Sequence, residues 1–152
     1  MQVAEIAKAV QAVNAEQAWP DVNVTGVAFD SRKLQAGDLF IPLMGANDGH
    51  QYIQSAIEHG AVATLWASDH ADDVPEDLPV IMVADTLTAL QQLGQYYLQK
   101  INPKVVAVTG SNGKTTTKDM IASVLGTQFN VTKTHANFNN QIGVPVTLLS
   151  ME

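Results

Sequence analysis

Residues 104–125 read KVVAVTGSNGKTTTKDMIASVL, and this stretch decides the fold class. The apolar run at 104–108 predicts a buried strand, residues 109–113 a tight turn, and residues 114–125 an amphipathic helix. The β-rich segment 129–132 predicts the strand that follows. A strand, a helix and a second strand in this order form a β-α-β unit, which indicates a parallel sheet and an α/β fold.

The turn between the predicted strand and helix carries a phosphate-binding pattern. Its glycines let several backbone N–H groups point at one anion, and the helix dipole adds positive charge. Lys114 can reach the β- and γ-phosphates of ATP, and the Thr115 hydroxyl can ligate Mg²⁺. The common pattern has a glycine where this chain has Val108, so the match is to the shorter form G-x-x-G-K-T. The alternative is a helix N-terminus with an exposed lysine. The expected phosphate-binding residues are Gly110, Ser111, Asn112, Gly113, Lys114 and Thr115.

The preceding hundred residues predict a small mixed α/β domain. Asp85 is suited to cap a helix that runs to Ile101, and Asn102-Pro103 then breaks the helical pattern. We therefore predict a domain over residues 1–102, and the truncated start of a phosphate-loop, parallel-sheet domain over residues 103–152. The other predicted elements are helices at 2–13 and 51–59 and strands at 22–29, 39–43, 61–66 and 79–83.

Composition excludes several classes of protein. The chain has 152 residues, a formal net charge of −7 and no basic block, which argues against nucleic acid as a partner. It has no cysteine, so disulfides and thiolate metal sites are ruled out. No apolar stretch is long enough to span a bilayer, and the N-terminus lacks the pattern of a signal peptide. We expect a cytoplasmic protein with no obligate protein partner.

Three further polar segments are candidates for binding. In Asp30-Ser31-Arg32, the only arginine of the chain and a hydroxyl suit a pyrophosphate or carboxylate, although the residues alone favour an Asx-type turn with a solvated arginine. His50 follows an Asp-Gly turn and is either a ligand contact or structural. His59 and His70 are expected on the surface. Residues 134–145 hold Asn137, Asn139 and Asn140, whose amides would either bind a ligand at the carboxyl edge of the sheet or form turns.

These motifs, taken in order, resemble the Mur ligase family, the ATP-dependent amide-bond ligases of peptidoglycan precursor synthesis. The loop at 109–116 is similar to the family's short phosphate loop, which adds Thr116 to the expected phosphate contacts. Asp30-Ser31-Arg32, Gly37-Asp38-Leu39-Phe40 and Asp48-Gly49-His50 resemble the family's N-terminal domain. Residues 137–149 are most similar to the members that add D-alanyl-D-alanine.

The resemblance implies a substrate and a reaction. The N-terminal domain would bind the UDP end of a UDP-N-acetylmuramoyl-tripeptide through Ser31, Arg32 and the loop around His50. Asn139 and Asn140 would lie where this substrate approaches the ATP γ-phosphate. ATP would activate the peptide carboxylate as an acyl phosphate, which the amine of D-alanyl-D-alanine attacks. Lys114, as the catalytic residue, and Mg²⁺ on Thr115 would neutralise the transferring phosphoryl group.

Family members continue well past residue 152, so we predict that this chain alone does not catalyse ligation. Three alternatives remain. The chain could act as a non-catalytic UDP-sugar-binding module, or belong to a ligase that adds the third peptide residue. It could also be a small kinase or GTPase, which would leave the N-terminal hundred residues unexplained.

Overall fold

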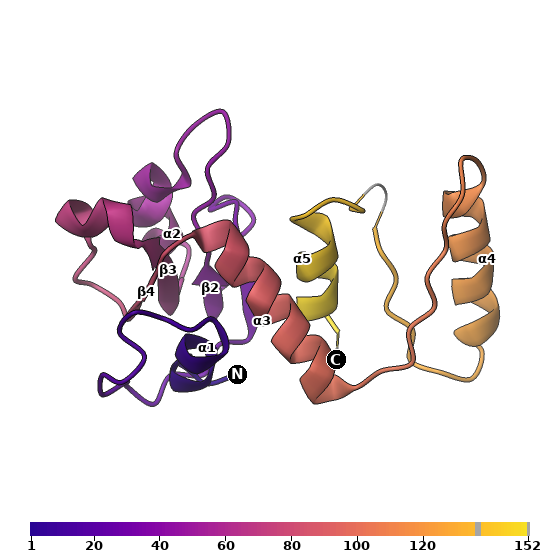
Figure 1. The fold of residues 1–152 in the computed structure, drawn as a ribbon, viewed down its shortest axis with the longest axis horizontal. Coiled ribbons are helices and arrows are strands. Elements are labelled where there is room, and N and C mark those ends of the chain that lie inside the picture. Colours follow the sequence, from indigo (N-terminus) through magenta and orange to yellow (C-terminus); the bar gives the residue numbers. More distant parts are fainter. Residues whose placement is uncertain (136–137, 152) are drawn as a thin grey trace.

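The computed structural model describes residues 1–135 and 138–151. An N-terminal α/β unit is followed by a long helix and then by two helices that lie outside the sheet (Figure 1). The elements in chain order are α1 (Val3–Ala9), β1 (Gly26–Ala28), β2 (Asp38–Phe40), the 3₁₀ turn η1 (Gly49–Tyr52), α2 (Ile53–Glu58), β3 (Ala63–Ala67), the 3₁₀ segment η2 (Ser68–Asp73), β4 (Val80–Val83), α3 (Thr86–Ile101), α4 (Lys114–Leu125) and α5 (Gly143–Leu149).

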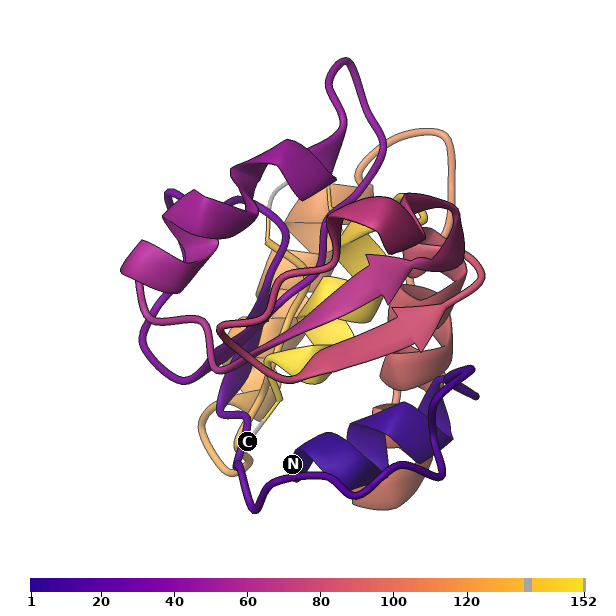
Figure 2. The ribbon, with the colours of Figure 1, turned by 90° about the vertical axis from the view of Figure 1, so that its left-hand side faces the viewer.

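The four strands form one parallel sheet in the order β1-β2-β3-β4. Side chains alternate between its two faces, as the period of a strand requires. Leu39, Leu65 and Ile81 lie on the face that α1 and α3 cover, whereas Phe40 packs with Ala56 of α2 on the other. Figure 2 shows the helices on either side of the strands. The sheet is therefore buried on both faces, which confirms the predicted α/β class.

Helix α3 is the long element that covers the sheet. Its start confirms the prediction, because the Asp85 carboxylate accepts a hydrogen bond from the Thr88 N–H at 2.7 Å. Its end is also where the sequence indicates, at Asn102, which adopts the left-handed conformation with φ 48°. Near that end, the Tyr96 hydroxyl and Lys100 ammonium both donate to the Glu5 carboxylate, so α1 is tied to α3.

Several predicted elements are shorter in the structure. The helix predicted at 2–13 ends at Ala9, because Gln11 turns left-handed with φ 52°. The strand predicted at 22–29 pairs only over Gly26–Ala28, and that at 39–43 over Asp38–Phe40. The helix predicted at 51–59 opens with η1, where the Asp48 side chain accepts from the His50 N–H. The predicted elements therefore exist in the structure but are shorter at their ends.

The second predicted unit is only partly formed. Helix α4 has the expected bounds, but the strands predicted at 104–108 and 129–132 are wrong, since neither segment is a strand in the structure. Val105, Val106 and Phe129 are each 60–66% exposed. A parallel strand is stable when it has a neighbour and covered faces, and α4 alone does not cover these segments.

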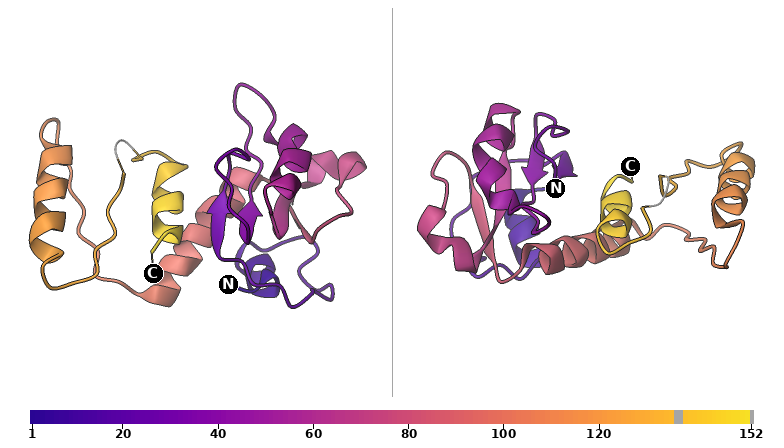
Figure 3. Two further views of the ribbon diagram at one scale, coloured as in Figure 1. Left: turned by 180° about the vertical axis from the view of Figure 1, so that it is seen from behind. Right: turned by 90° about the horizontal axis from the view of Figure 1, so that it is seen from above.

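Helix α5 is absent from the sequence-based prediction, in which residues 134–145 either bind a ligand or form turns. It packs along α3 and contacts β1, so it lies between the N-terminal unit and α4 (Figure 1 and Figure 3). Ile142, Val146 and Leu149 join the main apolar core of the sheet. Across the described residues, no helix combines the length and apolar character needed to cross a membrane.

Candidate functional site

The parallel sheet brings the polar segments of the N-terminal unit to one edge. Ser31 and Arg32 follow β1, the loop with Asp48 and His50 follows β2, and His70 follows β3. Because the strands are parallel, their carboxyl ends meet at the same edge, where open α/β sheets bind ligands. The sequence alone placed the first two segments among the candidates, and the topology adds the third.

Arg32 lies at this edge in a forked ion pair with Asp30. Its Nε donates to Asp30 Oδ1 at 2.9 Å and its second terminal nitrogen donates to Oδ2 at 2.8 Å. These bonds, together with the bond from the Arg32 backbone N–H, lower the pKa of Asp30 to about 2. The Arg32 side chain is 84% exposed, so its remaining N–H groups face solvent and can donate to a further anion.

Ser31, between these two charged residues, is only 6% exposed. No buried side-chain nitrogen or oxygen of the described residues lacks a hydrogen-bond partner, so the Ser31 hydroxyl is not an orphaned buried group. Asp30-Ser31-Arg32 therefore forms the Asx-type turn that one interpretation of the sequence predicts, and the exposed Arg32 guanidinium can still bind a ligand.

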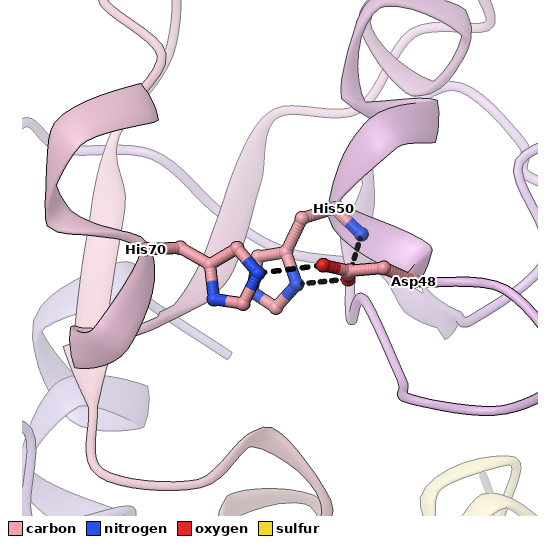
Figure 4. Close-up of side chains that lie close together, drawn as sticks. All are labelled: Asp48, His50 and His70. Atoms are coloured by element: carbon pink, nitrogen blue, oxygen red, sulfur yellow. Dashed lines mark hydrogen bonds and ion pairs between the residues drawn. The ribbon is translucent and has the colours of Figure 1, made fainter.

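Asp48, His50 and His70 form a hydrogen-bonded cluster behind this edge (Figure 4). His50 Nδ1 lies 2.7 Å from Asp48 Oδ1, and His70 Nε2 lies 2.6 Å from Asp48 Oδ2. The two imidazoles are stacked, with their ring centroids 3.9 Å apart. The His50 and Trp66 rings meet edge to face, with their centroids 4.6 Å apart. One carboxylate thus joins the loop after β2 to the segment after β3.

The surroundings of His50 fix its tautomer. Its side chain is 4% exposed, and its Nε2 accepts a hydrogen bond from the Ala67 N–H at 3.2 Å. Nε2 therefore carries no proton, and the neutral ring holds its proton on Nδ1, which it donates to Asp48. The ring is bonded at both nitrogens, so His50 holds the loop closed rather than facing solvent.

The same cluster has the composition of a metal site, because ligand atoms of Asp48, His50 and His70 lie within 4.8 Å of one another. The hydrogen bonds argue against that use. A metal on His50 Nδ1 would displace the proton that this nitrogen carries while Nε2 accepts from Ala67. The cluster is better described as three side chains that satisfy one another.

His70, expected on the surface, is partly exposed there and also belongs to the cluster. Its side chain is 23% exposed, and both of its ring nitrogens face carboxylates, since Nδ1 lies 2.7 Å from Asp69 Oδ1. Both nitrogens can donate only in the imidazolium form. The bonds to Asp69 and Asp48 accordingly raise the pKa of His70 above its ordinary value of 6.5. The position of His70 in the sequence could have indicated this role, since it follows β3, whose carboxyl end lies beside that of β2.

The raised pKa of His70 predicts a pH-dependent stability. A group whose folded pKa is raised stabilises the fold fully below its unfolded pKa, here 6.5, and this stabilisation is lost as the pH rises through the folded value. We expect the free energy of unfolding to fall across that alkaline range. Burial raises the pKa of Asp48, but its bonds from His50 and His70 outweigh this and lower it to about 2, so its own titration lies far below this range.

Urea unfolding followed by tryptophan fluorescence, from about pH 6 to about pH 9, checks this prediction. The variant His70→Gln should flatten the dependence. The matched control is His59→Gln, because His59 Nδ1 faces the backbone oxygen of Ser55 rather than a carboxylate. An equal pH dependence in the wild type and in His70→Gln would show that His70 is not its source.

The phosphate loop lies at the start of α4, apart from this edge (Figure 3). Gly110 and Gly113 adopt φ values of 148° and 77°, which glycine tolerates and other residues rarely adopt. Lys114 folds back so that its ammonium donates to the Gly110 carbonyl oxygen. Gly110, Ser111, Asn112, Gly113, Lys114, Thr115 and Thr116 are all exposed. The loop is therefore open to solvent at the positive end of a 12-residue helix.

The two asparagines differ in their surroundings. Asn140 Oδ1 accepts from the Ile142 N–H at 3.2 Å and from the Gly143 N–H at 2.7 Å, so it stabilises the start of α5. Asn139 is exposed. Ala136 and Asn137 of the same motif lie outside the described residues. Of these two asparagines, Asn140 stabilises the fold through its side chain, whereas the exposed Asn139 remains available for a ligand.

Comparison with known proteins gives matches to one family over most of the chain. Residues 23–97 match the family model described as Mur ligase family, catalytic domain, and residues 108–152 match the Mur ligase middle domain. A UDP-N-acetylmuramoyl-tripeptide–D-alanyl-D-alanine ligase of Bacillus subtilis is 51% identical over 150 residues, covering 98% of this chain and 33% of the relative. The Escherichia coli ligase of the same name is 39% identical over 140 residues, covering 91% of this chain and 30% of the relative.

Solved structures give the same result. MurF from Acinetobacter baumannii superposes with a TM-score of 0.84 at 32% identity, over 99% of this chain and 33% of its own. The MurF ligase of Thermotoga maritima in complex with ADP gives a TM-score of 0.71 at 30% identity, over 86% of this chain and 30% of its own. The chain thus spans about a third of the length of the relatives that it matches.

Proposed function

Because the chain belongs to the Mur ligase family, we propose that it supplies the nucleotide-substrate domain and the phosphate loop of an ATP-dependent ligase. The reaction is the addition of D-alanyl-D-alanine to a UDP-N-acetylmuramoyl-tripeptide, a cytoplasmic step of peptidoglycan precursor synthesis. The observation that carries this proposal is the 51% identity to a ligase of that name over 150 residues. Residues 1–102 form the substrate domain in this proposal, and residues 103–152 begin the ATP-binding domain.

The proposed contacts to the UDP end lie at the carboxyl edge of the sheet. Arg32 offers an exposed guanidinium that Asp30 already orients, and guanidinium donors suit the paired oxygens of a pyrophosphate. Ser31, which lies mostly buried between Asp30 and Arg32, would offer its hydroxyl as a second contact. His50 contributes by holding the loop after β2 in place through Asp48 and Ala67.

The residues of the phosphate loop fit ATP and Mg²⁺. The first turn of α4 has unpaired N–H groups, and the exposed Thr115 hydroxyl is an oxygen ligand of the kind that Mg²⁺ prefers. When bound, Mg²⁺ would supply positive charge beside the phosphates. The exposed Lys114 would exchange its hydrogen bond to the Gly110 carbonyl for one to the γ-phosphate, where its charge would stabilise the transferring phosphoryl group.

A second function is favoured for the 152-residue chain on its own. The segments that flank α4 are not strands, and the phosphate loop is exposed throughout. A loop without a formed sheet behind it is not preorganised for phosphoryl transfer. We therefore propose that the isolated chain acts as a UDP-sugar-binding module without ligase turnover.

Calorimetric titration tests the proposed function, with UDP-N-acetylmuramoyl-tripeptide, UDP alone and Mg-ATP as ligands. We expect both UDP ligands to bind and Arg32→Ala to weaken their binding by about 10- to 100-fold, because the variant removes charge-assisted bonds to the pyrophosphate. Arg32→Lys should restore only part of the affinity, since a point charge lacks the forked geometry.

The matched control is Lys33→Ala, which removes a positive charge from the adjacent exposed position. If Lys33→Ala weakens UDP binding as much as Arg32→Ala does, the effect is only general electrostatic attraction. If a folded sample binds Mg-ATP but neither UDP ligand, the N-terminal assignment is wrong and a generic phosphate-loop protein becomes the better interpretation.

A further inference from the structure

Helix α3 holds both ends of the segment that carries the phosphate loop. The chain leaves α3 at Asn102, runs through the phosphate loop and α4, and returns to the side of α3 as α5 (Figure 1). Of all contacts between separate elements, those between α3 and α5 are the most extensive. The segment between residues 102 and 143 is therefore attached at two places on one helix.

The attachment through α5 depends on a close approach of two backbones. A Cβ atom added to Gly94, in the middle of α3, would lie 3.0 Å from the Cα and 3.1 Å from the Cβ of Pro145. Glycine inside a helix is less favourable than alanine, so its presence in α3 needs a reason. The structure gives the reason, since the missing side chain of Gly94 leaves space for Pro145 of α5.

Hydrogen bonds extend this contact on both sides of Gly94. The Gln91 side chain donates to the backbone oxygen of Gln141 at 3.3 Å, and the Tyr97 hydroxyl donates to that of Met151 at 2.9 Å. Residues 91, 94 and 97 are spaced by three, so they lie along one face of α3. The first residue of α5, Gly143, also packs closely against the preceding chain, since a Cβ added to it would lie 2.6 Å from the Cα of Phe138.

We infer that α5 and the residues on either side of it, 141–151, form a clasp on Gln91, Gly94 and Tyr97 of α3 that positions the phosphate-loop segment against the N-terminal unit. Gly94 is its positioning residue, because a Cβ added there would lie 3.0 Å from the Cα of Pro145. The clasp itself stands on the packing alone. That the positioned loop meets a UDP-linked substrate rests on the proposed function.

Hydrogen exchange tests the clasp without any ligand. The α5 amides of Val146 and Ser150 donate to Ile142 and Val146, and they should be protected in the wild type. Gly94→Ala should reduce their protection about tenfold or more, because the added methyl forces Pro145 away. Tyr97→Phe, which keeps the ring and removes one hydrogen bond, should reduce it about fivefold.

The matched control is Gln95→Ala, at an exposed position one residue away on α3. Protection of β3 and β4 should be unchanged in every variant, which shows that the N-terminal unit stays folded. Helix propensity alone predicts the opposite sign, since alanine stabilises a helix relative to glycine. Equal or greater α5 protection in both Gly94→Ala and Tyr97→Phe would overturn the clasp.

Fluorescence energy transfer tests the positioning. The chain has no cysteine, so Glu58→Cys on α2 and Ser123→Cys on α4 give two unique labelling sites at exposed positions. We expect the distance distribution of the otherwise wild-type chain to broaden in Gly94→Ala and not in Gln95→Ala. An identical distribution in Gly94→Ala would overturn the positioning role. Failure of the proposed function would instead appear as absent UDP binding, while the distance distribution still broadens in Gly94→Ala.

Discussion

Replacing Lys114 by alanine is expected to lower the rate of ligation about 10²- to 10³-fold, with a much smaller effect on the Michaelis constant for the UDP substrate. The ammonium is the one positive side chain in the exposed loop at 110–116. In the proposed reaction, its charge would be needed most when negative charge moves between the γ-phosphate and the substrate carboxylate. Its loss should therefore appear in the rate of the chemical step rather than in the binding of the distant UDP end.

The measurement needs a chain of family length. Residues 1–152 can be joined to the remaining two thirds of the Bacillus subtilis relative, and phosphate release can be followed with saturating D-alanyl-D-alanine. Lys104→Ala is the control, because Lys104 is an exposed lysine that lies ten residues before the loop lysine. Comparable turnover in Lys114→Ala and Lys104→Ala would remove Lys114 from the catalytic role.

Replacing Gly49 by alanine is expected to destabilise the N-terminal unit by about 3 kcal/mol, at the upper end of what overpacking of a buried site causes. The added Cβ would lie 2.6 Å from the backbone nitrogen and 2.7 Å from the backbone oxygen of Leu43. These atoms belong to the chain that leaves β2, and they cannot rotate away as a flexible side chain could. The loop with Asp48 and His50 would have to move with them.

Chemical denaturation measured by the fluorescence of Trp66 and Trp19 checks this value. Gly45→Ala is a matched control in the same loop, because the nearest atom to its added Cβ would be 3.9 Å away, at the Asn47 backbone oxygen. It should change the free energy of unfolding by less than about 0.5 kcal/mol. A similar loss in both variants would show that loop entropy, and not the contact with Leu43, determines the effect.

Local signals in the sequence predicted part of the fold well. Asp85 caps α3 as expected, and α4 has the bounds that its glycine start and apolar stripe indicate. Both depend on residues close together in the sequence. The strands predicted at 104–108 and 129–132 failed because a parallel strand depends on neighbours and covering helices, which apolar composition does not supply.

The candidate site was predictable to a similar degree. Arg32 and the phosphate loop were found from residue type and spacing, and both are exposed and open to a ligand. His70 was missed because its partner Asp48 is 22 residues away, and only the parallel order of β2 and β3 brings them together. α5 was missed because its stability comes from the contact with Gly94, not from its own Gly-Val-Pro start.

The order of the strands has a consequence for how the chain folds. Since β1, β2, β3 and β4 are neighbours in the same order as in the sequence, each new strand pairs with the one made just before it. Such a sheet can grow in step with synthesis, strand by strand, with only short stretches of chain to close. α3 then seals its face before the phosphate loop has left the ribosome. The nascent N-terminal unit is therefore expected to resist proteases while residues 103–152 are still being made.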